Sequence, residues 1–195
     1  FDNVTHYPHE SDERGKQGLR DMFSLSSEDD NSPYIIFSNG GSDEIIERSM
    51  RFFDLPPKHT LLIGMGSQFP DVVTFANTYR NSLGGVTYGN TEPPLDMSLN
   101  DMILQALDKK KKERRSNRRG YYICNFSTPT GDKADPEIVR EFSEYMEREK
   151  ILVVVDEAYG ATLKREESAV HLAQELSNIV VLRSDFSKGM GLPGL

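Results

Sequence analysis

Cysteine and long apolar runs are both scarce in this sequence. Cys124 is the only cysteine among 195 residues, so the chain cannot form an intramolecular disulfide, and a reducing cytoplasm is the expected compartment. No apolar run approaches about 20 residues, the length that a membrane-spanning helix needs. The four histidines show no metal-ligand spacing, which with one cysteine argues against a zinc site. The sequence therefore points away from membrane-spanning, disulfide-stabilised and zinc-binding classes.

Positive charge is also in short supply. Aspartate and glutamate number 31 against 23 lysines and arginines, a net charge of −8, so the surface as a whole is not expected to attract nucleic acid or an anionic membrane. One basic run, 109–119, contains eight basic residues and one acid. It is compatible with a nucleic-acid patch or a localisation signal, but without interleaved aromatic residues a solvated loop is the preferred interpretation.

Apolar runs alternate with amphipathic stretches along the chain. Strands are predicted at 33–37, 60–64, 86–88, 121–125, 151–156 and 179–182. Helices are predicted at 17–25, at about 70–82, after Ser98 as an N-cap, and after Asp135 as an N-cap followed by proline. This alternation predicts an α/β fold with a mostly parallel sheet and helices on both faces. Residues 1–32 are predicted to be an N-terminal segment that leads into a domain spanning 33–195.

Three of the predicted strands end in polar groups. A Pro-Thr-Gly turn begins after Thr128, an Asp-x-x-Tyr stretch begins at Asp156, and a Ser-Lys pair ends at Lys188. The intervals between these residues are 28 and 32 positions, each with room for one crossover helix. We expect the three strand ends to converge. Lys188 follows an apolar run within a turn of small residues, so we expect its amine to be partly desolvated, which favours use as a nucleophile.

In this order, the three motifs resemble those of the fold-type I, pyridoxal-phosphate-dependent aminotransferases of class I/II, and most of all the histidinol-phosphate aminotransferase branch. The resemblance runs from about Tyr7 to Leu195. It implies the three-layer αβα large domain, pyridoxal 5′-phosphate as cofactor, and transfer of an amino group from an amino acid to a 2-oxo acid. It also implies a cytoplasmic homodimer that serves amino-acid metabolism.

The resemblance further implies a piece of a longer protein, an expectation that the start at Phe1 supports. The seventh strand of the large domain and the C-terminal small domain then lie beyond Leu195. So do an arginine expected just after Leu195 and a later arginine that would bind the substrate carboxylate. The chain alone is expected to transaminate poorly or not at all.

The family's catalytic roles fall on three residues. Lys188 would hold the cofactor through its amine, and once freed it would move a proton from the substrate Cα. Asp156 would pair with the protonated pyridine nitrogen, and Tyr159 would donate a hydrogen bond to the phenolate oxygen. The structural alternatives are an exposed loop lysine, a helix-capping aspartate and a core tyrosine.

Four further residues would complete the cofactor site by the same resemblance. Ser42 and Asp43, at a Gly-Ser helix start, would cradle the phosphate, and Ser187 or Ser184 would add a hydroxyl. An ordinary helix entry is the alternative for the cradle.

Two aromatic residues are the last family matches. Phe69 would stack on the cofactor ring, and Tyr7 would reach the phosphate of the neighbouring subunit. A core phenylalanine and a surface tyrosine are the alternatives.

Two positions depart from the family pattern. Thr128 stands where the family usually has an asparagine, and Asn125 is the nearest amide. Asp185 stands where the family has serine or threonine, and a carboxylate beside a phosphate dianion is repulsive. Ser184 could take that role if Asp185 is turned away. These departures leave open a decarboxylase or lyase similar to threonine-phosphate decarboxylase, or an inactive fragment that acts as a binding or dimerisation module.

Overall fold

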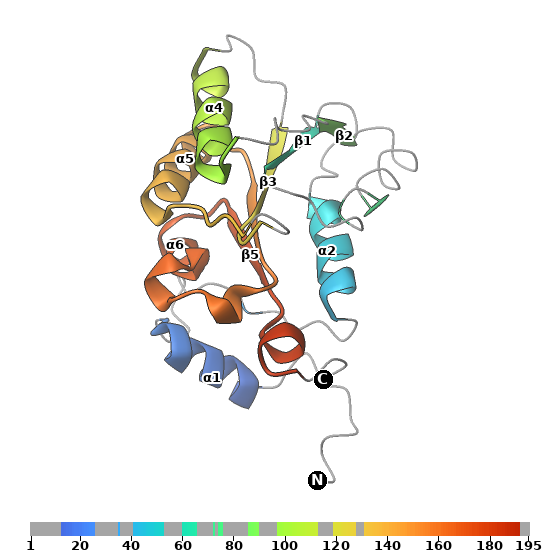
Figure 1. The fold of residues 1–195 in the computed structure, drawn as a ribbon, viewed down its shortest axis with the longest axis vertical. Coiled ribbons are helices and arrows are strands. Elements are labelled where there is room, and N and C mark those ends of the chain that lie inside the picture. The colour runs from blue at the N-terminus through green and yellow to red at the C-terminus, as the bar shows by residue number, and fades with distance from the viewer. Residues whose placement is uncertain are drawn as a thin grey trace.

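The structure of the chain is a computed structural model (Figure 1). It describes residues 13–25, 35, 41–52, 60–65, 72, 74, 75, 86–89, 97–112, 119–127 and 131–191.

A parallel sheet forms the centre of the described structure. Its five strands are β1 (Thr60–Met65), β2 (Val86–Gly89), β3 (Arg119–Cys124), β4 (Val153–Glu157) and β5 (Ile179–Arg183). They lie in the order β2-β1-β3-β4-β5, and every neighbouring pair is parallel. The α/β prediction is therefore confirmed, and five of the six predicted strands are found within a few residues of their expected bounds. The strand predicted at 33–37 lies almost wholly outside the described residues.

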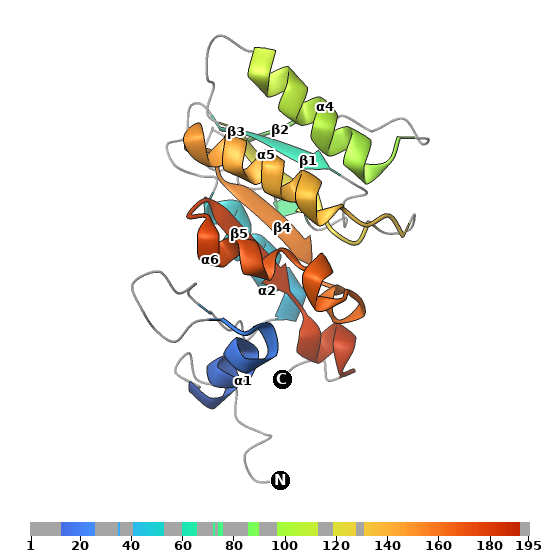
Figure 2. The same ribbon diagram turned by 90° about the vertical axis from the view of Figure 1, so that its left-hand side faces the viewer.

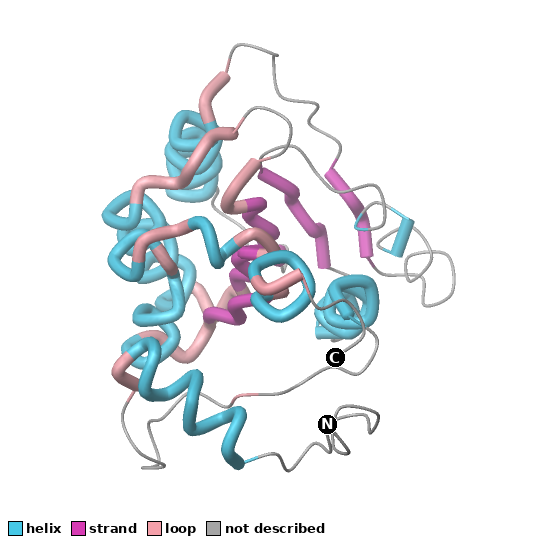
Figure 3. The backbone as a smooth tube through the Cα atoms, turned by 60° about the horizontal axis from the view of Figure 1, so that its bottom comes forward, coloured by secondary structure: helices cyan, strands magenta, loops and turns pink. Residues whose placement is uncertain are grey.

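Helices cover both faces of this sheet. One face carries α4 (Leu99–Lys112), α5 (Pro136–Arg148) and the short α6 (Leu172–Glu175), whereas α2 (Gly41–Phe52) lies on the other (Figures 1 and 2). Figure 3 shows the magenta strands between these two groups of cyan helices. Another helix, α1 (Glu13–Phe23), packs near the end of β5; it begins four residues earlier than the helix predicted at 17–25. The predicted helix at 70–82 falls mostly outside the described residues, although 72, 74 and 75 are helical.

The alternation of side chains along the strands divides the core in two. Tyr121, Val153 and Val155 face α4, α5 and α6 in the larger cluster. Tyr122 and Val154 face α2 in the smaller one. Because successive side chains of a strand point to opposite faces, both sides of β3 and β4 are apolar and buried. The strand ends are therefore held rigidly between two packed layers.

Two of the predicted helix starts, those capped by Ser98 and Asp135, are confirmed. The hydroxyl of Ser98 accepts the Asp101 backbone N–H at 3.1 Å, and the Asp135 carboxylate accepts that of Glu137 at 2.9 Å ahead of Pro136. Each cap satisfies a backbone donor that the helix itself leaves unpaired.

The basic run 109–119 is not simply a solvated loop. Its first four residues continue α4 to Lys112, and residues 113–118 lie outside the described structure. The Lys110 side chain is buried and its Nζ is 2.9 Å from a carboxylate oxygen of Glu149, while Lys111 pairs with Glu141 of α5. Part of the positive charge therefore serves to pack α4 on α5. None of the described helices combines the length and apolar character that a membrane crossing requires.

Candidate active site

Two adjacent carboxylates end β4, an inner strand of the sheet, and point to opposite faces. Asp156 shares a face with Val154 and so lies on the α2 side. Glu157 shares a face with Val155 and so lies on the side of α5 and α6. Both side chains are buried, Asp156 at 7% exposure and Glu157 at 0%. Their surroundings differ completely.

Asp156 has hydrogen-bond donors but no cationic partner within the described part of the chain. One carboxylate oxygen accepts the Tyr122 hydroxyl at 2.6 Å, and the other accepts the Ala158 backbone N–H at 2.9 Å. Burial raises the pKa of Asp156, and the two hydrogen bonds offset this only in part. A buried carboxylate is costly unless a cation compensates it. The site therefore favours a positively charged partner at Asp156.

The Glu157 carboxylate, in contrast, has hydrogen-bond donors and a cationic partner within the protein. Its carboxylate accepts the Ser168 hydroxyl at 2.6 Å and the Ala169 backbone N–H at 2.7 Å, and the Arg183 guanidinium lies 2.8 Å away. Burial raises the pKa of Glu157, while these hydrogen bonds and the Arg183 charge oppose the rise. Sequence reasoning missed this group. The only available signals were a second acid beside Asp156 and an arginine that closes the neighbouring strand.

Lys188 lies in a π-helical turn, Asp185–Gly189, just after β5. The Met190 backbone N–H closes this turn on the Asp185 carbonyl at 2.9 Å. Single π-turns are rare and frequently occur at functional sites. The Lys188 ammonium lies 5.7 Å from the centre of the Tyr159 ring, so the structure brings together two of the predicted catalytic residues.

The Lys188 side chain is nevertheless exposed, so the expected partial desolvation is not found in this chain. Tyr159 is also exposed, at 40%, and is not a core tyrosine. Ser187 is half-buried.

Asp185 is held in place by Arg183. Two guanidinium nitrogens of Arg183 each lie 2.7 Å from a different oxygen of the Asp185 carboxylate. This bidentate geometry is the strongest form of the arginine–carboxylate contact. The carboxylate that departs from the family pattern is thus compensated by an internal cation, while Ser184 is buried at the end of the strand. Ser184 uses its backbone carbonyl to accept the Lys188 N–H at 2.8 Å.

The remaining predicted residues are only partly described. Ser42 and Asp43 lie in the first turn of α2, half-buried and exposed respectively, on the sheet face to which Asp156 points. Thr128, Phe69 and Tyr7 lie outside the described residues.

Asn125 does not replace the missing amide. Its side chain is buried on the Glu157 side of the sheet, where its amide nitrogen is 3.4 Å from Glu157 and its oxygen accepts the Ala134 N–H at 3.1 Å. No group of three or more histidine, cysteine or acidic side chains suited to a metal occurs among the described residues.

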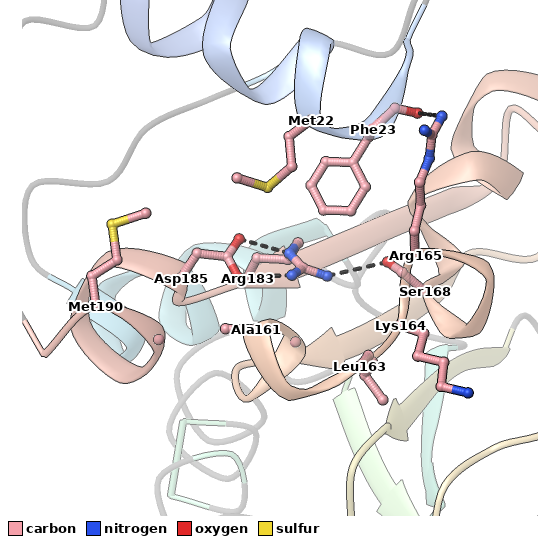
Figure 4. A pocket seen from close by; sticks show the side chains of 12 residues that line it. Met22, Phe23, Ala161, Leu163, Lys164, Arg165, Ser168, Arg183, Asp185 and Met190 are labelled. Atoms are coloured by element: carbon pink, nitrogen blue, oxygen red, sulfur yellow. Dashed lines mark hydrogen bonds and ion pairs between the residues drawn. The ribbon is translucent and has the colours of Figure 1, made fainter.

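A pocket of about 260 Å³ opens between α1 and the π-turn (Figure 4). Its lining includes Phe23, Arg183, Asp185 and Met190, but not Asp156, Tyr159 or Lys188. The predicted catalytic residues therefore do not line the pocket, whereas Gly160 and Gly189, the chain neighbours of Tyr159 and Lys188, do.

The chain matches the family model described as aminotransferase class I and II over residues 25–195. It belongs to this family, whose members use pyridoxal phosphate. The buried strand-end carboxylate and the lysine of the next strand end are consistent with that membership.

Histidinol-phosphate aminotransferases are prominent among the relatives. The enzyme of Macrococcus caseolyticus is 30% identical over 196 residues, which cover 100% of this chain and 50% of the relative. The enzyme of a Geobacillus strain is also 30% identical, over 85% of this chain and 41% of the relative. The chain thus spans about half the length of the curated relatives it matches.

Solved structures share the fold. The histidinol-phosphate aminotransferase of Clostridium acetobutylicum aligns with a TM-score of 0.69 at 21% identity, covering 99% of this chain and 51% of that one. L-threonine-O-3-phosphate decarboxylase of Porphyromonas gingivalis aligns with a TM-score of 0.64 at 19% identity, over 98% and 50%. At such identities the likeness confirms the three-layer α/β fold and does not specify the reaction.

Proposed function

We propose that this chain is the cofactor-binding part of a pyridoxal-phosphate-dependent aminotransferase of the histidinol-phosphate type, which moves an amino group from an amino acid to a 2-oxo acid. The observation that carries the proposal is Asp156. It is a buried carboxylate near the end of the inner strand β4 and has no cationic partner among the described residues. A protonated pyridine nitrogen is the partner that this arrangement fits.

The other predicted residues support the same site. When bound, the cofactor supplies a ring that accepts electrons from the substrate. Asp156 would hold a proton on the ring nitrogen, and Tyr122 and Ala158 would keep its carboxylate oriented. Lys188 would attach the cofactor through its amine and later move a proton from the substrate Cα. Tyr159, whose ring lies beside the Lys188 ammonium, would donate a hydrogen bond to the phenolate oxygen.

The remaining assignments complete the proposal. Ser42, Asp43 and Ser187 would contact the phosphate, Phe69 the ring, and Thr128 would stand near the phenolate oxygen. We also propose a cytoplasmic homodimer in which Tyr7 reaches the partner subunit's phosphate. Sedimentation of the chain would show the dimer, and a monomer at micromolar concentration would argue against it.

The test is addition of pyridoxal 5′-phosphate to the purified chain. A new absorbance near the visible edge should appear and should be fixed by borohydride on the peptide that contains Lys188. Lys188→Ala should abolish both signals. Asp156→Asn should weaken binding, whereas Asp101→Asn, at an exposed helix start, should not.

Addition of an amino acid then separates the reactions. Conversion of the cofactor to its amine form supports an aminotransferase, and release of carbon dioxide identifies a decarboxylase, an alternative that the Asp185 and Thr128 departures leave open. An inactive binding or dimerisation module would show no cofactor signal at Lys188 at all. That result would overturn the proposal.

A further inference from the structure

Arg183 joins the two strand ends that carry the predicted catalytic residues. Its guanidinium contacts Glu157, next to Asp156 on β4, and Asp185, three residues before Lys188. Glu157 and Arg183 are also register partners in the β4–β5 pair. One side chain therefore couples the position of Lys188 to that of Asp156.

Neighbouring residues hold the Arg183 guanidinium in a defined position. The Phe23 ring of α1 lies 4.7 Å from its central carbon, and Arg165 ties α1 to the same region by donating to the Phe23 carbonyl at 2.8 Å (Figure 4). On another side, a Cβ built on Gly160 would lie 2.5 Å from the guanidinium, so this position accepts only glycine without a shift. The Ser168 hydroxyl, 3.1 Å from Arg183, completes the contacts. The side chain is left 14% exposed.

The turn that carries Lys188 is fixed by the same group of contacts. The bond between Arg183 and Asp185 holds the first residue of the turn, and Gly189 packs against Ala161 so closely that an added Cβ would lie 2.5 Å from the Ala161 Cβ. Ala161 directly follows Gly160, the residue that borders Arg183. The turn is thus held at its first residue by Arg183 of β5 and at its last residue by the segment that follows β4.

We propose that Arg183 is a positioning residue for Lys188, with a second role in cancelling the charge of Asp185. This proposal rests on the proposed function, in which Lys188 binds an aldehyde that carries a phosphate. Arg183 holds the turn so that the Lys188 amine stays beside Tyr159. Its charge also prevents the Asp185 carboxylate from repelling the phosphate dianion.

The two roles are separated by two aldehydes that differ only in phosphate, pyridoxal 5′-phosphate and pyridoxal. In Arg183→Gln, Asp185 loses its cation, so binding of the phosphate-bearing aldehyde should fall about tenfold further than binding of pyridoxal. Labelling of Lys188 by pyridoxal should also fall relative to exposed Lys150, measured by mass spectrometry after borohydride fixation. In the double variant Arg183→Gln/Asp185→Asn, the phosphate preference should return while Lys188 labelling stays low.

A conservative variant and a control guard against a general loss of folding. Arg183→Lys keeps the charge but cannot span two carboxylates, so it should keep the phosphate preference and lower Lys188 labelling. Arg140→Gln breaks another arginine–carboxylate pair, with exposed Glu175, and should change neither quantity. Circular dichroism checks that each variant is folded.

The proposal is overturned if Arg183→Gln weakens the binding of both aldehydes equally, or if the double variant does not restore the phosphate preference. It is also overturned if Arg140→Gln changes binding and labelling in the same way as Arg183→Gln. If neither aldehyde labels Lys188 in the wild-type chain, that result contradicts the proposed function instead. The positioning role is then decided by amide hydrogen exchange over residues 184–190. Faster exchange there in Arg183→Gln but not in Arg140→Gln supports it, and equal exchange rejects it.

Discussion

Asp156 and Glu157 are neighbours in sequence and are both buried, yet their carboxylates have different partners. Glu157 meets an arginine, a hydroxyl and a backbone N–H on the α5 and α6 side of the sheet. Asp156 meets a tyrosine hydroxyl and a backbone N–H on the α2 side, with no described cation near it. The comparison shows that burial alone does not identify a functional acid. The charge that lacks an internal partner is the one available to a ligand.

The largest expected effect comes from removing the satisfied member of the pair. Glu157→Ala leaves the Ala169 N–H unpaired, takes one carboxylate from Arg183 and opens a cavity, so the free energy of unfolding should fall by about 3 to 5 kcal/mol. Urea denaturation measures this. Glu175→Ala, which breaks an exposed pair, should cost less than about 1 kcal/mol. Equal losses would show that Glu157 has no special structural role.

A smaller loss is expected where Arg183 passes over the backbone. Gly160→Ala places a methyl group 2.5 Å from the guanidinium, and the displacement that this forces should lower the free energy of unfolding by about 1 to 3 kcal/mol. Gly18→Ala is the matched control, because Gly18 lies within α1 and an added Cβ there meets nothing within 4 Å. That variant should gain about 0.5 to 1 kcal/mol from helix propensity. Thermal unfolding of both variants shows whether the first loses stability and the second gains it.

Substitution of Asp156 should change the free energy of unfolding in the opposite direction to substitution of Glu157. Asp156→Asn keeps the shape but removes a buried, uncompensated charge, so the chain without cofactor should gain about 1 kcal/mol in the free energy of unfolding at neutral pH. The same variant should bind pyridoxal phosphate more weakly. A loss of stability without cofactor would mean that a cation already compensates Asp156.

The smallest effect is the pH dependence of that gain. The pKa of Asp156 is raised by burial, so the folded state holds its proton to a higher pH than the unfolded state, where the pKa is about 4. Below about pH 4 the aspartate is neutral in both states. As the pH rises through the folded pKa, wild type loses stability and the variant does not, so the advantage of Asp156→Asn should grow with pH. An advantage that stays constant between pH 4 and pH 8 would contradict this origin.

Features that depend on neighbouring residues were readable from the sequence. The caps at Ser98 and Asp135 involve partners two or three residues away, and the strand runs stand out as unbroken apolar stretches. The nearness of Lys188 to Tyr159 also followed from the order of the motifs and their resemblance to the family. The basic run misled because Lys110 has its partner 39 residues away, at Glu149, the residue that caps the C-terminus of α5.

The sequence by itself determined the alternating order of strands and helices, the family, and the two strand ends that carry Asp156 and Lys188. Tertiary structure alone decided which acid is compensated. The pleat sends consecutive side chains to opposite faces, and the partners on each face come from distant segments. The same holds for Arg183, whose contacts with Phe23, Glu157 and Asp185 exist only because β4, β5 and α1 are packed together. Charge compensation depends on distance in space, which the order of residues does not record.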